Sequence, residues 1–172
     1  MDADTLTGMA KVLIGWASRA GAATDVAEVL ADELRRAGVE VHVAGLKCSP
    51  DVDGCDLVVL GSGVQAGQWY PEASAWISTY RAELAATRVA VFNVCLNAAD
   101  PSKRDESLGY NRAILGKLSP VAQESFGGRY VPEKVSWVKR QFLRTLQKPA
   151  QDHVDETAVR AWARELVGLV EG

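Results

Sequence analysis

The sequence predicts an open α/β domain in which helices cover both faces of a parallel β-sheet. Apolar, β-branched runs alternate along the chain with segments whose apolar residues recur every three to four positions. Strands that lack polar alternation are typical of a parallel sheet buried on both faces. The chain has 172 residues, and 48% of them are hydrophobic, which suits one domain with a full core. We therefore predict a single three-layer domain over residues 1–172, with five parallel strands wound in both directions.

The first strand and the first helix have the clearest patterns. An apolar run predicts a strand at 11–16, and apolar residues four apart, such as Val26 and Leu30, predict a helix over 24–37. Gly38 is a typical helix stop. The other predicted strands lie at 39–44, 56–60, 88–95 and 121–126.

Two further helices complete the predicted domain. Pro71 begins a helix that we expect to run to about residue 85, because proline is tolerated in the first turn of a helix. The last helix is predicted over 155–170, with Val159, Trp162 and Leu166 facing the core.

The loops that follow the strands are the places to look for a ligand. In open parallel sheets ligands bind outside the carboxyl ends of the strands, which here are followed by loops 16–24, 61–70 and 95–102. The first loop contains Ser, Gly and Ala before a helix begins. The free N–H groups of a helix N-terminus favour an anion, so a phosphate is the expected guest. Ser18 and Thr24 could also act only as ordinary caps of the first helix, although the whole loop fits a ligand role.

Three other phosphate-handling classes do not fit these loops. A nucleotide triphosphatase needs a lysine and a hydroxyl residue where Ala22 and Ala23 stand. A dinucleotide fold needs GxGxxG after the first strand, whereas the only similar run, at 61–66, follows the third. A phosphoacceptor receiver needs acidic residues that 16–18 and 60–62 lack. What remains is a phosphomonoester held by hydroxyls and backbone amides.

The first loop resembles the phosphate loop of a known family. Ser18-Arg19-Ala20-Gly21 after an apolar strand, with Asp25-Val26-Ala27 on the following helix, resembles the flavodoxins. It is most similar to the flavodoxin-like, menaquinone-dependent protoporphyrinogen oxidases. The similarity continues through residues 60–67, 91–96, 127–130 and 161–165. It implies the flavodoxin-like strand order 2-1-3-4-5 and FMN as cofactor.

The resemblance also implies which residues hold FMN, and these fall into two groups. The phosphate group comprises Ser18, Arg19, Ala20, Gly21, Ala22, Ala23 and Thr24. The isoalloxazine group comprises Ser62, Gly63, Val64, Gln65, Gly67, Trp69, Cys95, Leu96 and Asn97. Because a flavin exchanges electrons through its ring, no side-chain acid, base or nucleophile is required.

Two departures from the family pattern affect this site. Ala23 stands where the family usually has threonine, which would cost about 1 kcal/mol of phosphate binding. Arg19 is the candidate to compensate for that loss. Ala66 replaces an aromatic neighbour of the flavin, and Trp69 or Tyr70 are the candidates to take its role.

The charge distribution bears on the partner. The net charge is −3, yet residues 103–148 contain 10 Lys and Arg against 4 Asp and Glu. A basic insertion at about 129–149 carries an apolar stripe over 134–147, which fits peripheral contact with an anionic membrane or attraction of a porphyrinogen with propionate groups. An ordinary surface helix fits the same pattern.

Two functions follow from these observations. The first is an FMN-dependent, protoporphyrinogen oxidase-like enzyme with a quinone acceptor. The second is a flavodoxin-type electron carrier that docks on redox partner proteins. We expect no nucleic-acid partner.

The remaining composition indicates a cytoplasmic protein without a metal site. The N-terminus is acidic and polar, and no apolar run approaches the roughly 18 residues of a membrane span. The three cysteines are odd in number and lack CxxC spacing, and only two histidines accompany them. A quinone acceptor would bring the protein to the cytoplasmic face of the membrane.

Overall fold

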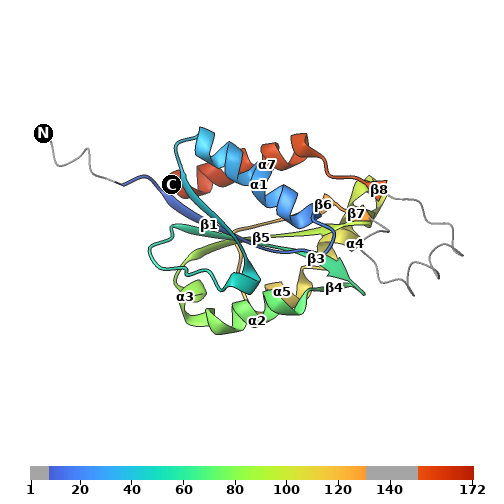
Figure 1. Cartoon of the computed structure of the whole chain (residues 1–172), viewed down its shortest axis with the longest axis horizontal. Helices are drawn as coiled ribbons and strands as arrows, with labels where there is room; N and C mark the ends of the chain where they lie inside the picture. Colours follow the sequence, from blue (N-terminus) through green and yellow to red (C-terminus); the bar gives the residue numbers. More distant parts are fainter. Residues whose placement is uncertain (1–7, 131–150) are drawn as a thin grey trace, which may run out of the picture.

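The computed structural model describes residues 8–130 and 151–172. Its centre is a parallel sheet with α1 and α7 on one face and α2, α3 and α5 on the other (Figure 1). The parallel strands are β1 (Lys11–Ala17), β2 (Glu40–Gly45), β3 (Leu57–Gln65), β5 (Arg88–Cys95) and β6 (Ala122–Gly127). Their spatial order is β2-β1-β3-β5-β6. This confirms the predicted flavodoxin-like order, because the extra strand β4 (Gln68–Trp69) pairs only with the end of β3.

The third strand is longer than its sequence pattern predicts. It was expected to end at residue 60, but β3 continues to Gln65 and turns back into β4 as an antiparallel hairpin. Ala66 and Gly67, the two turn residues, have φ values of 52° and 76°. Two positive φ values in succession are typical of the tight turns that match the twist of a hairpin. This hairpin stands at the carboxyl edge of the sheet.

The helices agree with the predictions except after Pro71 and between β5 and β6. The observed helices are α1 (Ala22–Arg36), α2 (Pro71–Thr79), α3 (Arg81–Ala85), α4 (Arg104–Gly109), α5 (Arg112–Leu115) and α7 (Glu156–Glu171). The predicted helix from Pro71 to about residue 85 is interrupted at Tyr80. Ser78 and Thr79 donate hydroxyl hydrogen bonds to carbonyls four residues earlier, at 3.0 and 3.1 Å. Such bonds compete with the helical backbone pattern and favour an end or a bend.

Two apolar cores lie on opposite faces of the sheet. Val12 and Ile14 of β1 face the core beneath α1 and α7, whereas Leu13 faces the core above α2. Residues that are two apart therefore share a face, as the pattern of a doubly covered sheet requires. The first core holds the aromatic triad Phe92, Phe126 and Trp162, whose ring centroids are 5.7–6.1 Å apart in edge contacts.

Gly61 is a point of close approach in the middle of the sheet. It pairs with Phe92 across β3 and β5, and a Cβ atom at this position would lie 1.9 Å from the Phe92 Cζ atom. The Phe92 ring therefore occupies the space that a side chain at Gly61 would need.

The ends of the predicted insertion form a short ribbon. Strand β7 (Arg129–Tyr130) pairs antiparallel with β8 (Gln151–Asp152), and Arg129 stands opposite Asp152. The predicted basic amphipathic stretch at 134–147 lies outside the described residues. Among the helices in the described part of the chain, none combines the length and apolarity needed to cross a membrane.

Candidate functional site

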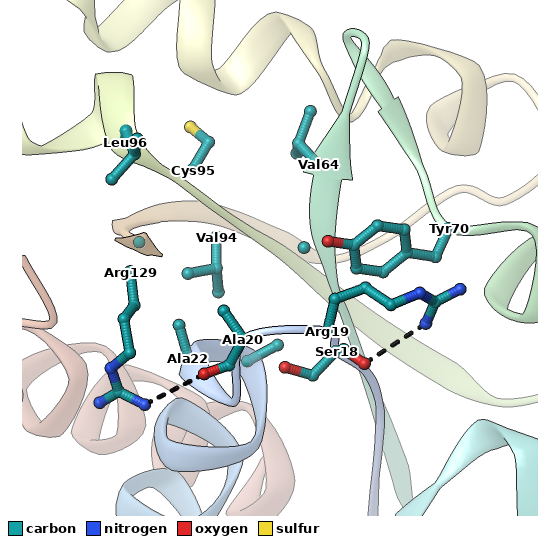
Figure 2. Close-up of a pocket in the computed structure, with 13 residues that line it drawn as sticks. Ser18, Arg19, Ala20, Ala22, Val64, Tyr70, Val94, Cys95, Leu96 and Arg129 are labelled. Atoms are coloured by element: carbon teal, nitrogen blue, oxygen red, sulfur yellow. Dashed lines mark hydrogen bonds between the residues drawn. The ribbon is translucent and has the colours of Figure 1, made fainter. Parts of the chain in front are cut away.

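A cavity of about 220 Å³ opens at the carboxyl edge of the sheet, where β1, β3, β5 and β6 end. The residues around it are Ser18, Arg19, Ala20, Ala22, Ala23, Gly63, Val64, Tyr70, Val94, Cys95, Leu96, Gly128 and Arg129 (Figure 2). All but Val94, Gly128 and Arg129 were named from the sequence, Tyr70 as the alternative to Trp69. The three loops that follow the carboxyl ends of the strands, 16–24, 61–70 and 95–102, therefore all contribute residues to one cavity.

One end of the cavity is the N-terminus of α1. Gly21 precedes the helix with φ 88°, and its N–H donates to Ser18 Oγ at 3.0 Å. The first helical hydrogen bond runs from the Asp25 N–H to the Gly21 carbonyl at 3.0 Å. Within the described chain, no side chain caps this helix, so the N–H groups of Ala22 and Ala23 keep their capacity to bind an anion. Neither Ser18 nor Thr24 acts as the ordinary cap that their residue types allow.

Arg19 is turned away from this helix N-terminus. Its guanidinium forms a two-pronged ion pair with Glu72 at the start of α2, with Nη2 2.9 Å from Oε2. The same group lies over the Tyr70 ring, 4.2 Å from its centroid. The structure therefore does not support compensation by Arg19 for the threonine missing at Ala23.

The Arg19–Glu72 pair has a consequence for acid stability. The hydrogen bond from Arg19 lowers the pKa of Glu72 from its ordinary 4.5 to about 2. Because the pKa of Glu72 is lower in the folded protein than in the unfolded chain, its ionised form stabilises the fold at pH values above the unfolded-state pKa. This stabilisation is lost as the pH falls through the folded-state pKa.

We expect Glu72→Gln to lower the free energy of unfolding by about 1–2 kcal/mol at pH 7. The difference from the parent should shrink between pH 4.5 and pH about 2, because Glu72 becomes protonated over this interval. Urea unfolding monitored by circular dichroism at pH 7, 5, 4 and 3 measures it. A difference that does not depend on pH would contradict the assignment.

The other end of the cavity is lined by Tyr70. Its half-buried ring lies across Gly63, where a Cβ atom would be 2.7 Å from the Tyr70 Cε2 atom. Glycine at 63 therefore makes room for the tyrosine. Tyr70 and the backbone of Gly63 and Val64 form a wall beside the strand ends (Figure 2).

Trp69, the predicted aromatic partner of the flavin, lies elsewhere. It is 6% exposed in the core above α2, and its Nε1 donates to Asn111 Oδ1 at 3.1 Å. Consecutive residues of an extended segment point to opposite sides, so burying Trp69 directs Tyr70 to the cavity. The sequence contained both candidates, but it did not show which one faces inward.

Two other predicted residues, Ser62 and Asn97, make hydrogen bonds outside the cavity wall. Ser62 is fully buried, and its Oγ accepts the N–H of Tyr70 at 3.0 Å. Asn97 donates from Nδ2 to Glu106 Oε1 at 3.1 Å. Neither side chain lines the cavity. Gln65 ends β3 and Gly67 is a turn residue of the same hairpin; both are exposed and lie away from the cavity wall.

A buried polar network fixes the segments around the ring end. Asn93 Nδ2 donates to Asn111 Oδ1 at 2.9 Å and to the Ser107 carbonyl at 2.8 Å. Ser125 Oγ donates to Asn93 Oδ1 at 2.7 Å. With the bond from Trp69, this network links the β3–β4 hairpin, β5, β6 and the α4–α5 segment. Sequence reasoning missed it, because its members have no common spacing.

Arg129 is a charged cavity residue that sequence reasoning missed. Its guanidinium lines the cavity beside the first loop, with Nη1 3.5 Å from the Ala20 carbonyl (Figure 2). Nη2 pairs with Asp25 of α1 at 2.5 Å, and Nε donates to Asp152 at 3.0 Å. One feature of the sequence could have pointed to Arg129: it follows two glycines, at 127–128, in a segment that resembles the protoporphyrinogen oxidase family.

The cavity thus combines two chemically different ends. Free helix amides and a serine hydroxyl suit a phosphate, and a glycine-backed wall with a tyrosine suits a flat ring. Together with the doubly wound sheet, this defines an α/β domain of the flavodoxin-like class. A family model for the flavodoxin domain matches residues 13–157, and the chain belongs to this family. Flavodoxin-family proteins bind FMN.

Individual relatives are distant but span nearly the whole chain. Protoporphyrinogen IX dehydrogenase (quinone) of Escherichia coli strain K12 is 24% identical over 175 residues, which covers 94% of this chain and 97% of that protein. Oxidised Flavodoxin 1 from Bacillus cereus superposes with a TM-score of 0.63 at 16% identity, covering 92% of this chain and 98% of its own. A mutant flavodoxin from Pseudomonas aeruginosa has a TM-score of 0.59 at 18% identity, with 94% and 99% coverage.

Proposed function

We propose that this protein is an FMN-dependent oxidoreductase, with the FMN phosphate at the N-terminus of α1 and the flavin ring beside Tyr70. The observation that carries the proposal is the uncapped first turn of α1, which opens into a cavity with an aromatic wall at its other end. When bound, FMN supplies electron exchange through its ring.

Each part of the cavity has a role in this proposal. The N–H groups of Ala22 and Ala23 and the hydroxyl of Ser18 bind the phosphate. The backbone of Gly63 and the Cys95–Leu96 segment border the ring, and Tyr70 covers it from the side of α2. A cavity of about 220 Å³ is small for a site that encloses its ligand, so one edge of the flavin stays exposed to a partner.

The proposed reaction is protoporphyrinogen oxidation with a quinone as acceptor. The similarity to the Escherichia coli protoporphyrinogen IX dehydrogenase supports it, because the match extends over 94% of this chain. An electron carrier is the second candidate, since the structural neighbours include flavodoxins. A quinone acceptor would also bring the protein to the cytoplasmic side of a membrane.

Cofactor binding is tested first. We expect the purified protein to be yellow and to release FMN on denaturation, or to bind added FMN with a stoichiometry near one. An absorption spectrum, followed by chromatography of the released cofactor, measures both properties. Colourless protein that does not bind added FMN would end the flavoprotein proposal.

The reaction is tested with the FMN-loaded protein. Protoporphyrinogen oxidation is measured with menaquinone as acceptor, for the intact chain and for a variant lacking residues 131–148. Turnover by the intact chain supports the enzyme. Turnover that the deletion removes, while FMN binding persists, would assign the basic segment to substrate or membrane contact. If the protein binds FMN but shows no turnover, the electron carrier becomes the favoured function.

A further inference from the structure

We propose that Arg129 is the cation that selects a phosphorylated flavin, and that it acts as a binding residue of the phosphate end of the cavity. This inference rests on the proposed FMN site and adds a specificity-determining residue to it. It reverses the expectation that Arg19, within the loop itself, has this role.

The two arginines lie on opposite sides of the same loop. Figure 2 shows Arg129 reaching along one side toward Ala20, and Arg19 extending along the other side toward Tyr70. A Cβ atom at Gly21, the residue that starts α1, would lie 3.3 Å from Arg129 Nη1. Arg129 therefore borders the helix N-terminus whose amides face the cavity.

The two guanidinium groups also differ in the hydrogen-bonding capacity that they keep. Both terminal nitrogens of Arg19 are engaged by the carboxylate of Glu72. In Arg129, Nε and Nη2 are held by Asp152 and Asp25. Within the described residues, the one hydrogen bond of Arg129 Nη1 is the 3.5 Å contact with the Ala20 carbonyl, which is long for a hydrogen bond. A guanidinium has five N–H donors, so Nη1 retains strong donors for an anion.

The carboxylates around Arg129 explain its position. Asp25 and Asp152 orient the guanidinium from two elements, α1 and β8, and its side chain is only 22% exposed. Asp25 belongs to the first turn of α1 and would repel a phosphate there if it were unpaired. Arg129 thus presents Nη1 to the phosphate and offsets one of the two carboxylate charges beside it. Both effects act on the phosphate and not on the ring.

The test compares FMN with riboflavin, which has the same ring and no phosphate. Dissociation constants for both flavins are measured by fluorescence titration for the parent, Arg129→Met and Arg19→Met. We expect Arg129→Met to weaken FMN binding by about tenfold to a hundredfold, and riboflavin binding by less than about threefold. Arg19→Met, the matched control, should change both affinities by a similar factor, because Arg19 contacts the ring end through Tyr70.

The outcomes separate this inference from the proposed function. If the parent prefers FMN and Arg129→Met keeps that preference, the inference is wrong and the flavoprotein proposal stands. Equal losses for the two flavins in Arg129→Met would also overturn it. If the parent binds neither flavin, both fail. Should Arg129→Met not fold by circular dichroism, Arg129→Gln retains a donor for Asp25 without the charge, and the same loss of preference is expected.

Discussion

Replacing Ala20 by aspartate is expected to lower the affinity for FMN by at least about a hundredfold, because the new carboxylate would stand within the proposed phosphate site. Ala20 lines the cavity between Ser18 and the start of α1 (Figure 2). Two like charges about 4 Å apart repel each other by about 4 kcal/mol at the effective dielectric constant of a protein surface. An aspartate here would in addition attract Arg129, whose Nη1 already contacts the Ala20 carbonyl.

The measurement is a pair of titrations, with FMN and with riboflavin. Ala20→Ser is the uncharged control, since it adds a small hydroxyl group without charge, and it should bind FMN within about threefold of the parent. Ala20 is half-buried in a loop, so we expect both variants to fold. If Ala20→Asp binds FMN as well as the control does, the phosphate does not lie at this loop.

The second large effect is expected at Gly61. We expect Gly61→Ala to lower the free energy of unfolding by about 3 kcal/mol, the upper end of what overpacking usually costs. The added methyl group would overlap the Phe92 ring, since its carbon would be 1.9 Å from Cζ. Phe92 is fully buried, and it is held by edge contacts with Phe126 and Trp162, so it cannot move aside without displacing both. Urea unfolding measures the effect.

A double-mutant cycle tests the cause. Phe92→Leu shortens the obstructing side chain, so the double variant with Gly61→Ala should be more stable than the sum of the two single losses predicts. Gly168→Ala is the control for glycine replacement in general. No atom lies within 4 Å of a Cβ at this helical position, and alanine there should stabilise by about 0.5–1 kcal/mol. Additive losses in the cycle would show that the Phe92 contact is not the cause.

The sheet could be predicted from sequence because its signal is local. Each long strand is an apolar run, which predicts a doubly wound parallel sheet. The strand order 2-1-3-4-5 comes from the resemblance of the loops to the flavodoxins. Strand β4 could not be predicted, because two residues have no period and Gln68–Trp69 is a strand only through pairing with β3. The end of α2 before Tyr80 could not be predicted either. It depends on whether the hydroxyl groups of Ser78 and Thr79 bond to water or to backbone carbonyls, and the sequence does not show which.

The site could be predicted at the level of loops but not of every side chain. The loops converge because parallel strands end at one edge. Which arginine faces the anion depends on distant partners: Glu72 is 53 positions from Arg19, and Ala20 is 109 positions from Arg129. The choice between Trp69 and Tyr70 likewise depends on Asn111, 42 positions from Trp69. No local pattern contains these pairings, so nearness in sequence favoured Arg19 and Trp69.

The long span between Arg129 and Asp25, 104 positions in the sequence, has a consequence during synthesis. Chains grow from the N-terminus at about 5–20 residues per second, so β1 and α1 leave the ribosome well before Arg129 and Asp152 do. The early segments already carry the loop and its amides, but the ion pairs that brace that loop from outside require the last third of the chain. A nascent polypeptide stalled before β7 would consequently lack these braces, so the first loop gains its full set of contacts only after Arg129 and Asp152 have been synthesised.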